Sequence, residues 1–348
     1  MSVTDIESTD LIVYGLSHHT VPLEMREHFS LSDESVRSIY SQLKHEESVR
    51  ESAVLSTCNR LEIVGVGDGE RLKCVFSRIL GEETKQGSDS VESVAYLKSE
   101  VDSLYHLFRV AAGLDSQMVG ETEIFGQIKN AYKEAIQHQL AGKMLHGAFQ
   151  KCFQQGKWAR SYTSIGRGHV STSTVAVELA SRIFGNLSQC RMLVVGTGEV
   201  AESAVKVFFS EGCKNIQFCG RNQERLHAFT SEFGSKSFLL EELPEILHEF
   251  DIVLTSTKSD SPIINSKMVQ KALEQRSARP LFFIDLAMPR DVDPQCSRED
   301  LVFVYNLDDL AKVANENIQL RLGEIIRCEQ RLSTVAKELW GNLRSHQK

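Results

Sequence analysis

Several kinds of feature are missing from this sequence, and each absence narrows the class of protein. No apolar run reaches the roughly 18 residues that a helix needs to cross a bilayer. The eight cysteines form no C-x-x-C pair, which argues against a disulfide framework and against a zinc site. Residues 1–15 are acidic and lack the basic and then apolar segments of a signal peptide. We therefore expect a cytosolic protein with reduced thiols, no metal and no membrane association.

Acidic residues are also absent from one long interval of an otherwise acidic chain. The net charge of −8 argues against a general nucleic-acid binder. Between Glu134 and Glu178, however, there is no Asp or Glu, and the interval contains Lys143, Lys151, Lys157, Arg160 and Arg167. Such an interval is either a docking site for a phosphate backbone or a solvated helix face, and charge alone leaves both interpretations open.

The pattern of apolar residues predicts an α/β protein with more than one domain. A length of 348 residues suggests two or three domains. Residues 1–165 alternate strand-like and helical segments and then become largely helical, which predicts an α+β catalytic domain. Residues 166–305 predict a doubly wound Rossmann domain, because continuously apolar runs such as "DIVLTST" and "LFFIDLA" are typical of parallel strands covered on both faces. Residues 306–348 predict a long helix for linking and dimerisation.

A glycine-rich turn marks the predicted dinucleotide site. In "RMLVVGTGEVAES" an apolar strand ends at Gly196, the pattern G-x-G-x-x-A continues through Gly198 and Ala201, and a helix follows. The glycines let the backbone approach a pyrophosphate, which the helix N-terminus stabilises. The context of strand, turn and helix within a βαβ unit supports this interpretation. The predicted cofactor-binding residues are Gly196, Thr197, Gly198, Glu199, Val200, Ala201 and Arg221.

The residues after the second Rossmann strand predict which nucleotide binds. NAD-binding proteins usually place an acid about 20 residues after the glycines, where it holds the ribose 2′-hydroxyl. This chain instead has "FCGRNQER", with Arg221 at that point and no acid. An arginine pairs with a 2′-phosphate, so we expect NADPH; the alternative is a surface arginine on the edge of the domain.

Cys58, in "LSTCNRLEIVG", lies between two strand-like runs and not inside one. An inert packed cysteine is the common fate of a single thiol, but the adjacent Arg60 would favour a thiolate. A thiol combined with NADPH suggests reduction of a thioester to an aldehyde. A histidine would be needed beside the leaving group, and His106, His18 and His19 are the candidates.

Several long motifs occur together in a fixed order: "GLSHHTVPLEMRE", "LSTCNRLEIV", "HLFRVAAGLDSQMVGETEIFGQIKNAY", "GTGEVAE", "RPLFFIDLAMPRDVDP" and "VYNLDDL". With these motifs the chain closely resembles the glutamyl-tRNA reductases, from about Ile12 to at least Asn317. The resemblance implies NADPH-dependent reduction of glutamyl-tRNA(Glu) to glutamate-1-semialdehyde, the first step of five-carbon tetrapyrrole (porphyrin and haem) biosynthesis. It also implies a cytoplasmic homodimer that hands its aldehyde to an aminomutase.

The resemblance implies a role for each matching residue. Cys58 would attack the ester carbonyl and hold the glutamyl group as a thioester, and His106 would assist departure of the ribose hydroxyl. The residues implied to hold the glutamate are Thr57, Arg60, Ser116, Glu121 and Gln127. Arg60 suits a carboxylate as well as thiol activation. The acid-free interval then becomes a place where the tRNA could lie.

Three departures from the family pattern bear on these expectations. Thr197 stands where alanine is usual, and Gly220 precedes Arg221 where asparagine is usual. The chain stops at Lys348, short of the family's fuller helical dimerisation domain. The tail nevertheless has an apolar stripe, for which we expect self-association, the alternative being packing on its own domain.

Two other functions fit parts of the sequence. A shikimate-type dehydrogenase would need a catalytic Lys/Asp pair, for which Lys258 is a weak candidate, and would not need Cys58. A nucleotide-sensing Rossmann protein that binds a partner through its tail would leave the "STCNR" segment unexplained. Because acyl transfer and hydride transfer involve different large partners at one thiol, we also expect a hinge near Gly166–Gly168 or at the start of the tail helix.

Overall fold

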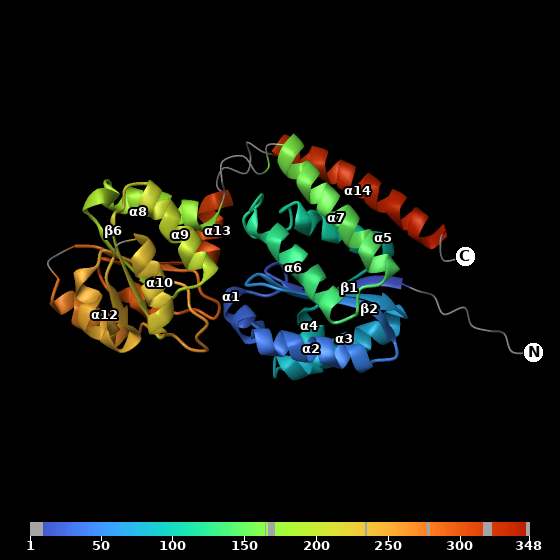
Figure 1. Ribbon diagram of the computed structural model, residues 1–348, viewed down its shortest axis with the longest axis horizontal. Coiled ribbons are helices and arrows are strands. Elements are labelled where there is room, and N and C mark those ends of the chain that lie inside the picture. Colours follow the sequence, from blue (N-terminus) through green and yellow to red (C-terminus); the bar gives the residue numbers. More distant parts are fainter. Residues whose placement is uncertain are drawn as a thin grey trace, which may run out of the picture. The chain divides into compact units, whose positions relative to one another are not determined.

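The computed structural model describes residues 10–163, 165, 171–233, 235–276, 279–315 and 322–345. These residues fall into two compact units (Figure 1). Unit 1 lies within Met1–Val170 and Glu316–Lys348, and unit 2 lies within Ser171–Asn315. The hinge expected at Gly166–Gly168 lies outside the described residues. The alternative position, the start of the predicted tail helix, falls on α13 (Leu307–Asn315), which belongs to unit 2.

Unit 1 is built on a four-stranded antiparallel sheet in the order β2-β3-β1-β4. The strands are β1 (Asp10–Ser17), β2 (Val49–Ser56), β3 (Arg60–Gly67) and β4 (Tyr96–Ser99). All eight residues of β3 are buried, as expected of a central strand covered on both faces. The hairpin β2–β3 is the segment that carries Cys58, so this sheet positions the thiol.

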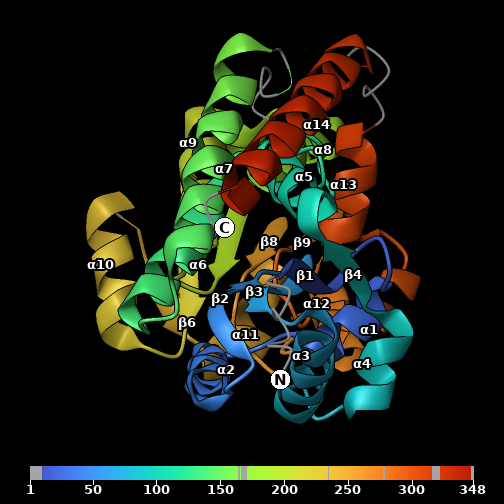
Figure 2. The ribbon, with the colours of Figure 1, turned by 90° about the vertical axis from the view of Figure 1, so that its right-hand side faces the viewer.

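Helices cover both faces of this sheet (Figures 1 and 2). They are α1 (Leu23–Arg26), α2 (Asp33–His45), α3 (Gly69–Glu83), α4 (Ser88–Val94), α5 (Glu100–Ala111), α6 (Glu123–Gln137) and α7 (Lys143–Tyr162), with one 3₁₀ turn, η1 (Glu27–Phe29). Ser32 caps α2 by accepting a hydrogen bond from the Ser35 backbone N–H at 3.1 Å. Helix α5 is anchored to the sheet because the Ser103 hydroxyl donates to the Leu11 carbonyl at 3.0 Å.

The tail helix α14 (Leu322–Ser345) packs against α5 and α7 of the same unit (Figures 1 and 2). Its stripe is largely buried there: Leu332 is fully buried, and Val335 and Trp340 are 8% and 5% exposed. The alternative of packing on its own domain therefore holds for these residues, and the expectation that they await a partner chain is wrong. Packing satisfies an amphipathic face as well as dimerisation does.

Unit 2 is a six-stranded parallel sheet in the order β10-β9-β8-β5-β6-β7. The strands are β5 (Arg191–Val195), β6 (Asn215–Gly220), β7 (Ser237–Leu239), β8 (Ile252–Thr255), β9 (Leu281–Asp285) and β10 (Val302–Asn306). The order reverses direction beside β5, which is where doubly wound sheets bind nucleotides.

Helices flank the sheet of unit 2: α8 (Thr172–Phe184), α9 (Glu199–Ser210), α10 (Gln223–Phe233), α11 (Leu243–Ile246), α12 (Ser266–Glu274) and α13 (Leu307–Asn315). Short 3₁₀ turns join them: η2 (Leu187–Gln189), η3 (Leu240–Glu242), η4 (Leu247–Glu249) and η5 (Pro294–Arg298). The predicted fold class, an α+β domain with a doubly wound Rossmann domain and a long C-terminal helix, is confirmed. Within the part of the chain that is described, no helix combines the length and apolarity that a membrane span requires.

Candidate active site

Cys58 lies in the tight turn that joins β2 to β3. Thr57 shapes this turn: its backbone N–H donates to the Arg60 carbonyl at 2.9 Å, and its hydroxyl accepts from the backbone N–H groups of Asn59 and Arg60, both at 3.1 Å. The loop after β1 clamps the turn from outside, because the His18 N–H donates to the Asn59 carbonyl at 2.9 Å. The thiol is thus held on a fixed hairpin tip and not on a mobile loop.

The charges around Cys58 disfavour a free thiolate. The residue is half-buried, and burial, followed by the carboxylates of Glu121 and Glu123, raises the pKa of the Cys58 thiol to about 12. Arg26 lowers this pKa, and its Nη1 donates a hydrogen bond to Asn59 Oδ1 at 2.6 Å. The thiol is therefore protonated at neutral pH, and a nucleophilic role requires a base that removes its proton.

A buried carboxylate, Glu62, lies behind the hairpin on β3. Its Oε1 accepts from Arg60 Nη1 at 2.7 Å and from the Tyr96 hydroxyl, and it lies 2.9 Å from His106 Nε2. Burial alone would raise the pKa of Glu62, but the Arg60 guanidinium and then His106 hold it well below its usual range. An ionised Glu62 therefore fixes the orientation of both the His106 ring and the guanidinium.

Asp115 completes this network from the loop after α5. Its carboxylate lies 3.2 Å from Arg60 Nη2, 3.1 Å from Arg109 Nη1 and 3.7 Å from His19 Nε2. The Arg60 side chain is only 1% exposed. Its guanidinium is thus engaged by two internal carboxylates, Glu62 and Asp115, and a substrate carboxylate would have to replace one of them.

Ser116 and Glu121 lie in the connection between α5 and α6. This connection turns at Gly120, whose φ is +93°; a Cβ there would lie 2.2 Å from the Ile165 carbonyl oxygen. Burial raises the pKa of Glu121 to about 7, while the neighbouring Ser116 hydroxyl lowers it and Glu123 raises it. A carboxyl group with a pKa near neutrality, close enough to Cys58 to alter the thiol, is suited to accept a proton.

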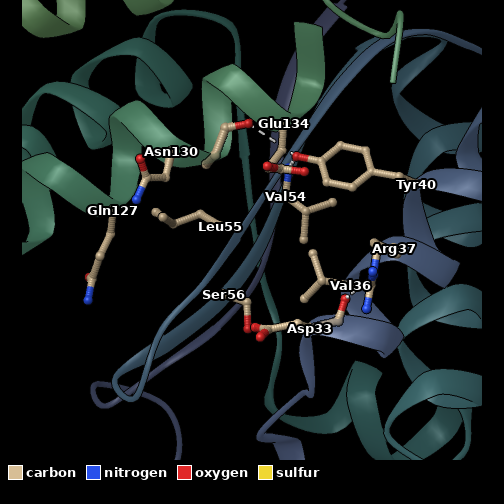
Figure 3. Close-up of a pocket in the computed structure, with 11 residues that line it drawn as sticks. Asp33, Val36, Arg37, Tyr40, Val54, Leu55, Ser56, Gln127, Asn130 and Glu134 are labelled. Carbon is tan, nitrogen blue, oxygen red and sulfur yellow. Dashed lines mark hydrogen bonds between the residues drawn. The ribbon is translucent and has the colours of Figure 1, made fainter. Parts of the chain in front are cut away.

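Gln127 lines a pocket of about 580 Å³ that begins beside the hairpin (Figure 3). The pocket lies between α2, α6 and the end of β2, and Ser56, two residues before Cys58, forms part of its wall. Gln127 and Asn130 point from α6 on one side, and Asp33 and Arg37 come from α2 (Figure 3). The predicted residues of unit 1 therefore form two neighbouring groups, the thiol network and this polar pocket.

The glycine-rich turn of unit 2 has the geometry expected of a phosphate site. Gly196 has φ +114°, and a Cβ there would lie 2.3 Å from the Ser256 carbonyl oxygen, so a side chain is excluded. Gly198 is the N-cap of α9, and a Cβ built on it meets nothing within 4 Å. The N-terminus of α9 therefore opens toward free space, while Ala201 is fully buried against the sheet.

A pocket of about 300 Å³ adjoins this turn. Its wall includes three cationic side chains, Arg221, Arg225 and Lys258. Asp291 orders the segment after β8 by accepting from the Thr257 backbone N–H at 2.8 Å. Exposed Glu199 and Val200 begin α9. Backbone N–H groups, a helix N-terminus and these cations fit a dinucleotide with an additional phosphate.

Two family models match this chain, one in each unit. Residues 14–163 match the family model described as "Glutamyl-tRNAGlu reductase, N-terminal domain", and residues 178–313 match "Shikimate / quinate 5-dehydrogenase". The glutamyl-tRNA reductase of Nitrosomonas europaea is 38% identical over 92% of this chain and 76% of its own length. That of Marinobacter nauticus is 34% identical over 96% of this chain and 78% of its own length. The chain belongs to the glutamyl-tRNA reductase family.

A solved member of the glutamyl-tRNA reductase family has the same fold. The enzyme from Methanopyrus kandleri aligns with a TM-score of 0.53 at 31% identity, over 96% of this chain and 80% of that one. The dehydrogenase match is confined to unit 2 and indicates a nicotinamide cofactor of the dehydrogenase type. A shikimate-type dehydrogenase as the identity of the whole chain is thereby excluded.

The structure adds residues that the sequence reasoning missed. Glu62, Asp115 and Tyr96 form the buried network, and Arg26 is the cation that lowers the pKa of Cys58. One signal was available, because Glu62 is an acid inside the apolar strand "RLEIVGVG", and such a residue needs a buried partner. No metal site was expected, and no group of three or more potential ligands occurs among the described residues.

Proposed function

We propose that this member of the glutamyl-tRNA reductase family acts through a thioester on Cys58 and uses NADPH. The observation that carries the proposal is the thiol at the tip of a hairpin whose strand β3 contributes to the buried network that fixes His106. The second support is a Rossmann unit on the same chain whose pocket contains cations at the position where a 2′-phosphate would bind.

The first step is acyl transfer from the tRNA to the thiol. As the Cys58 sulfur bonds to the ester carbonyl carbon, its S–H proton becomes acidic and passes to Glu121, whose pKa is near neutral. The bond between the carbonyl carbon and the ribose oxygen then breaks. His106, whose Nε2 is held by Glu62, would deliver a proton from its other ring nitrogen, Nδ1, to the departing ribose oxygen, which leaves as a hydroxyl. His106 would then recover a proton from solvent.

The second step reduces the thioester to an aldehyde and returns the thiol. NADPH supplies the hydride for this step when it is bound. In unit 2, Gly196 and Gly198 would accommodate the pyrophosphate at the start of α9, and Arg221 would pair with the 2′-phosphate. The product is glutamate-1-semialdehyde, which commits glutamate to tetrapyrrole synthesis.

The binding roles of the remaining residues follow from their positions. Ser116 and Glu121 would contact the glutamyl group, because they lie on the loop beside the thiol, and Thr57 would act through the shape of the turn. Gln127 would bind from the adjoining pocket. A cytoplasmic location, a homodimer and transfer of the aldehyde to glutamate-1-semialdehyde aminomutase are proposed from the family resemblance alone.

A pair of cysteine variants tests the proposal. Cys58→Ser should abolish aldehyde formation from glutamyl-tRNA and NADPH, because serine is a far poorer nucleophile at neutral pH. Cys74→Ser is the matched control, since Cys74 is an exposed free thiol on α3. NADPH binding should be unchanged in both variants, because the nucleotide pocket lies in unit 2.

Retention of activity in Cys58→Ser would contradict the thioester route. It would leave reduction without a covalent intermediate, and Cys58 would then be structural. A chain that binds NADPH but shows no aldehyde formation even with Cys58 intact would favour the nucleotide-sensing interpretation.

A further inference from the structure

A polar groove of about 530 Å³ runs between α7 and the tail helix α14, which lie side by side in Figures 1 and 2. Helix α7 contributes Lys151 and Gln155 to its lining. Helix α14 contributes the other lining residues: Arg327, Gln330, Arg331, Thr334, Val335 and Glu338. The proposed mechanism assigns no role to this groove. Its lining is rich in hydrogen-bond donors, which suits an anionic ligand and not an apolar one.

The charge of the groove is positive. Helix α7 has no acidic residue, so Lys151 faces the groove with no acid on its own helix. Three cations line the groove, Lys151, Arg327 and Arg331, against one acid, Glu338. A second acid of α14, Glu329, is neutralised elsewhere, because its Oε1 lies 3.1 Å from Arg109 Nε. Such an excess of positive charge on an acidic protein concentrates phosphate groups at this groove.

An aromatic stack extends from the edge of the groove. The Arg331 guanidinium lies 4.3 Å from the centre of the Trp158 ring, and its Nε donates to Gln155 Oε1 at 3.3 Å. The Trp158 ring is followed by the Tyr162 ring at a centroid distance of 6.4 Å and an interplanar angle of 18°. Tyr162 is 68% exposed, so the outer end of the stack is accessible. An exposed aromatic ring stacked next to cations is the arrangement that binds unpaired nucleotide bases.

Helix α7, which carries Trp158 and Tyr162, also contacts α5 and α6 through Arg160. Arg160, between the two aromatic residues in the sequence, donates Nη2 to the Ala111 carbonyl at 3.1 Å. Its guanidinium also lies 4.2 Å from the centre of the Phe125 ring, at the start of α6. This end of α7 therefore packs on the two ends of the connection between α5 and α6.

We propose that the α7–α14 groove and the stack Arg331–Trp158–Tyr162 form the surface that binds the RNA part of the substrate. Lys151, Arg327 and Arg331 would contact the phosphate backbone, and an unpaired base near the 3′ end would stack on the exposed face of Tyr162. The inference rests on the proposed function, because that function supplies an aminoacylated RNA as the substrate. It assigns the acid-free interval to a specific face of α7.

Two variants test the surface, and each has a matched control. Tyr162→Ala removes the exposed ring and should weaken binding of uncharged tRNA(Glu) by about tenfold, the loss of one base–aromatic stack. Arg327→Glu should weaken it further and reduce the dependence of affinity on salt concentration. Lys267→Glu, an exposed lysine on α12 of unit 2, makes the same change of charge and should have no such effect. Tyr162→Phe keeps the exposed ring and removes only the hydroxyl, so it should bind tRNA(Glu) nearly as well as the unmodified protein.

A small substrate separates this inference from the proposed function. 3′-O-glutamyl-adenosine has the reactive ester but no polynucleotide. The Tyr162→Ala and Arg327→Glu variants should therefore convert it to the aldehyde at the same rate as the unmodified protein. With glutamyl-tRNA the same variants should show a raised KM and an unchanged kcat. If the unmodified protein reduces glutamyl-tRNA and both variants match it in KM, the proposed surface is wrong. If the unmodified protein reduces neither substrate, the proposed function fails.

Fluorescence gives a readout that is independent of turnover. The chain has two tryptophans, and Trp340 is 5% exposed within unit 1. In a Trp340→Phe variant, Trp158 is the single tryptophan and reports directly on the stack. Adding tRNA should change its emission, and Tyr162→Ala should reduce this change. Emission that is unaffected by saturating tRNA would contradict base stacking at this position.

Discussion

The two candidate sites of this chain differ in whether their charged side chains are paired within the protein. Behind Cys58, cations and carboxylates are paired within the protein interior: Arg60 lies 2.7 Å from Glu62 and 3.2 Å from Asp115. In the nucleotide pocket of unit 2, Arg221 and Arg225 line the wall, and no Asp or Glu is among the lining residues that the structure describes. The first arrangement holds side chains in fixed orientations, whereas the second attracts a charge that must come from a ligand.

This difference reflects the kind of chemistry that each site supports. A thiol that must be acylated and released needs its neighbouring groups oriented before the substrate arrives, and a buried network provides that order. A cofactor pocket needs affinity, which donors and cations provide directly. The difference also predicts which property mutations at each site should change. Mutations behind Cys58 should affect stability together with turnover, whereas mutations in the nucleotide pocket should affect binding with little effect on folding.

The largest effect is expected from removing the charge of Glu62. Glu62→Gln leaves Arg60 and His106 without their shared carboxylate, and breaking a buried ion pair costs about 3–5 kcal/mol of unfolding free energy. Glu82→Gln is the control, because the Arg78–Glu82 pair is solvent-exposed and should contribute less than about 1 kcal/mol. Denaturant unfolding measures both variants. Equal stability of the two would show that the network is not a stabilising element.

A smaller and more selective effect is expected at Arg221. Arg221→Ala should weaken NADPH binding about 10- to 100-fold, the loss of one charge-assisted contact, and leave NADH binding nearly unchanged. Arg182→Ala, an exposed arginine on α8 that pairs with Glu178, is the control. Titration of each variant with both nucleotides provides the test. An equal loss for NADPH and NADH would instead assign Arg221 to the pyrophosphate, which the two nucleotides share.

The effect expected at Glu121 is confined to one range of pH. The pKa of Glu121 is raised from 4.5 to about 7 in the folded protein, so its folded state favours the protonated form. Its stabilising contribution is complete below about pH 4.5 and is lost as the pH rises through 7. Glu121→Gln should therefore match the unmodified protein near pH 4.5 and be more stable at pH 8, by about 1–3 kcal/mol.

The same Glu121 variant tests the proposed base at the thiol. Removing the carboxylate should lower the pKa of Cys58 and speed its alkylation at a fixed pH, because the negative charge of Glu121 raises that pKa. Turnover should nevertheless fall, because no base then accepts the thiol proton. Faster alkylation together with undiminished turnover would show that Glu121 acts on the thiol through charge alone.

How far the sequence predicts the molecule differs between the two sites. The nucleotide site is specified by residues close together in the sequence. Gly196 and Gly198 form the turn after β5, Ala201 lies in the first turn of α9, and Arg221 follows β6. The thiol network consists of pairs of residues that are far apart in the sequence. Glu62 and His106 are 44 positions apart, and Arg60 and Asp115 are 55 apart. No local pattern predicts such pairs, which depend on how β3 and α5 pack together.

Edge strands and the tail were the other points where the sequence was insufficient. Strands β7 and β10, at the two edges of the unit 2 sheet, were not predicted. Strand β7 has only three residues, and in β10 only Val302 is buried. The apolar stripe of α14 was expected to associate with a second chain, because a stripe does not indicate which surface covers it. Here α5 and α7 of the same unit do.

The most direct test of the account is mass spectrometry of the protein mixed with glutamyl-tRNA in the absence of NADPH. The account predicts a glutamyl adduct on the peptide that contains Cys58, which disappears when NADPH is added and does not form in Cys58→Ser. The network behind the hairpin and the proton-accepting Glu121 have their proposed meaning only if this adduct forms. An adduct on another cysteine, or none on a folded protein that binds NADPH, would contradict the claim that Cys58 is the nucleophile.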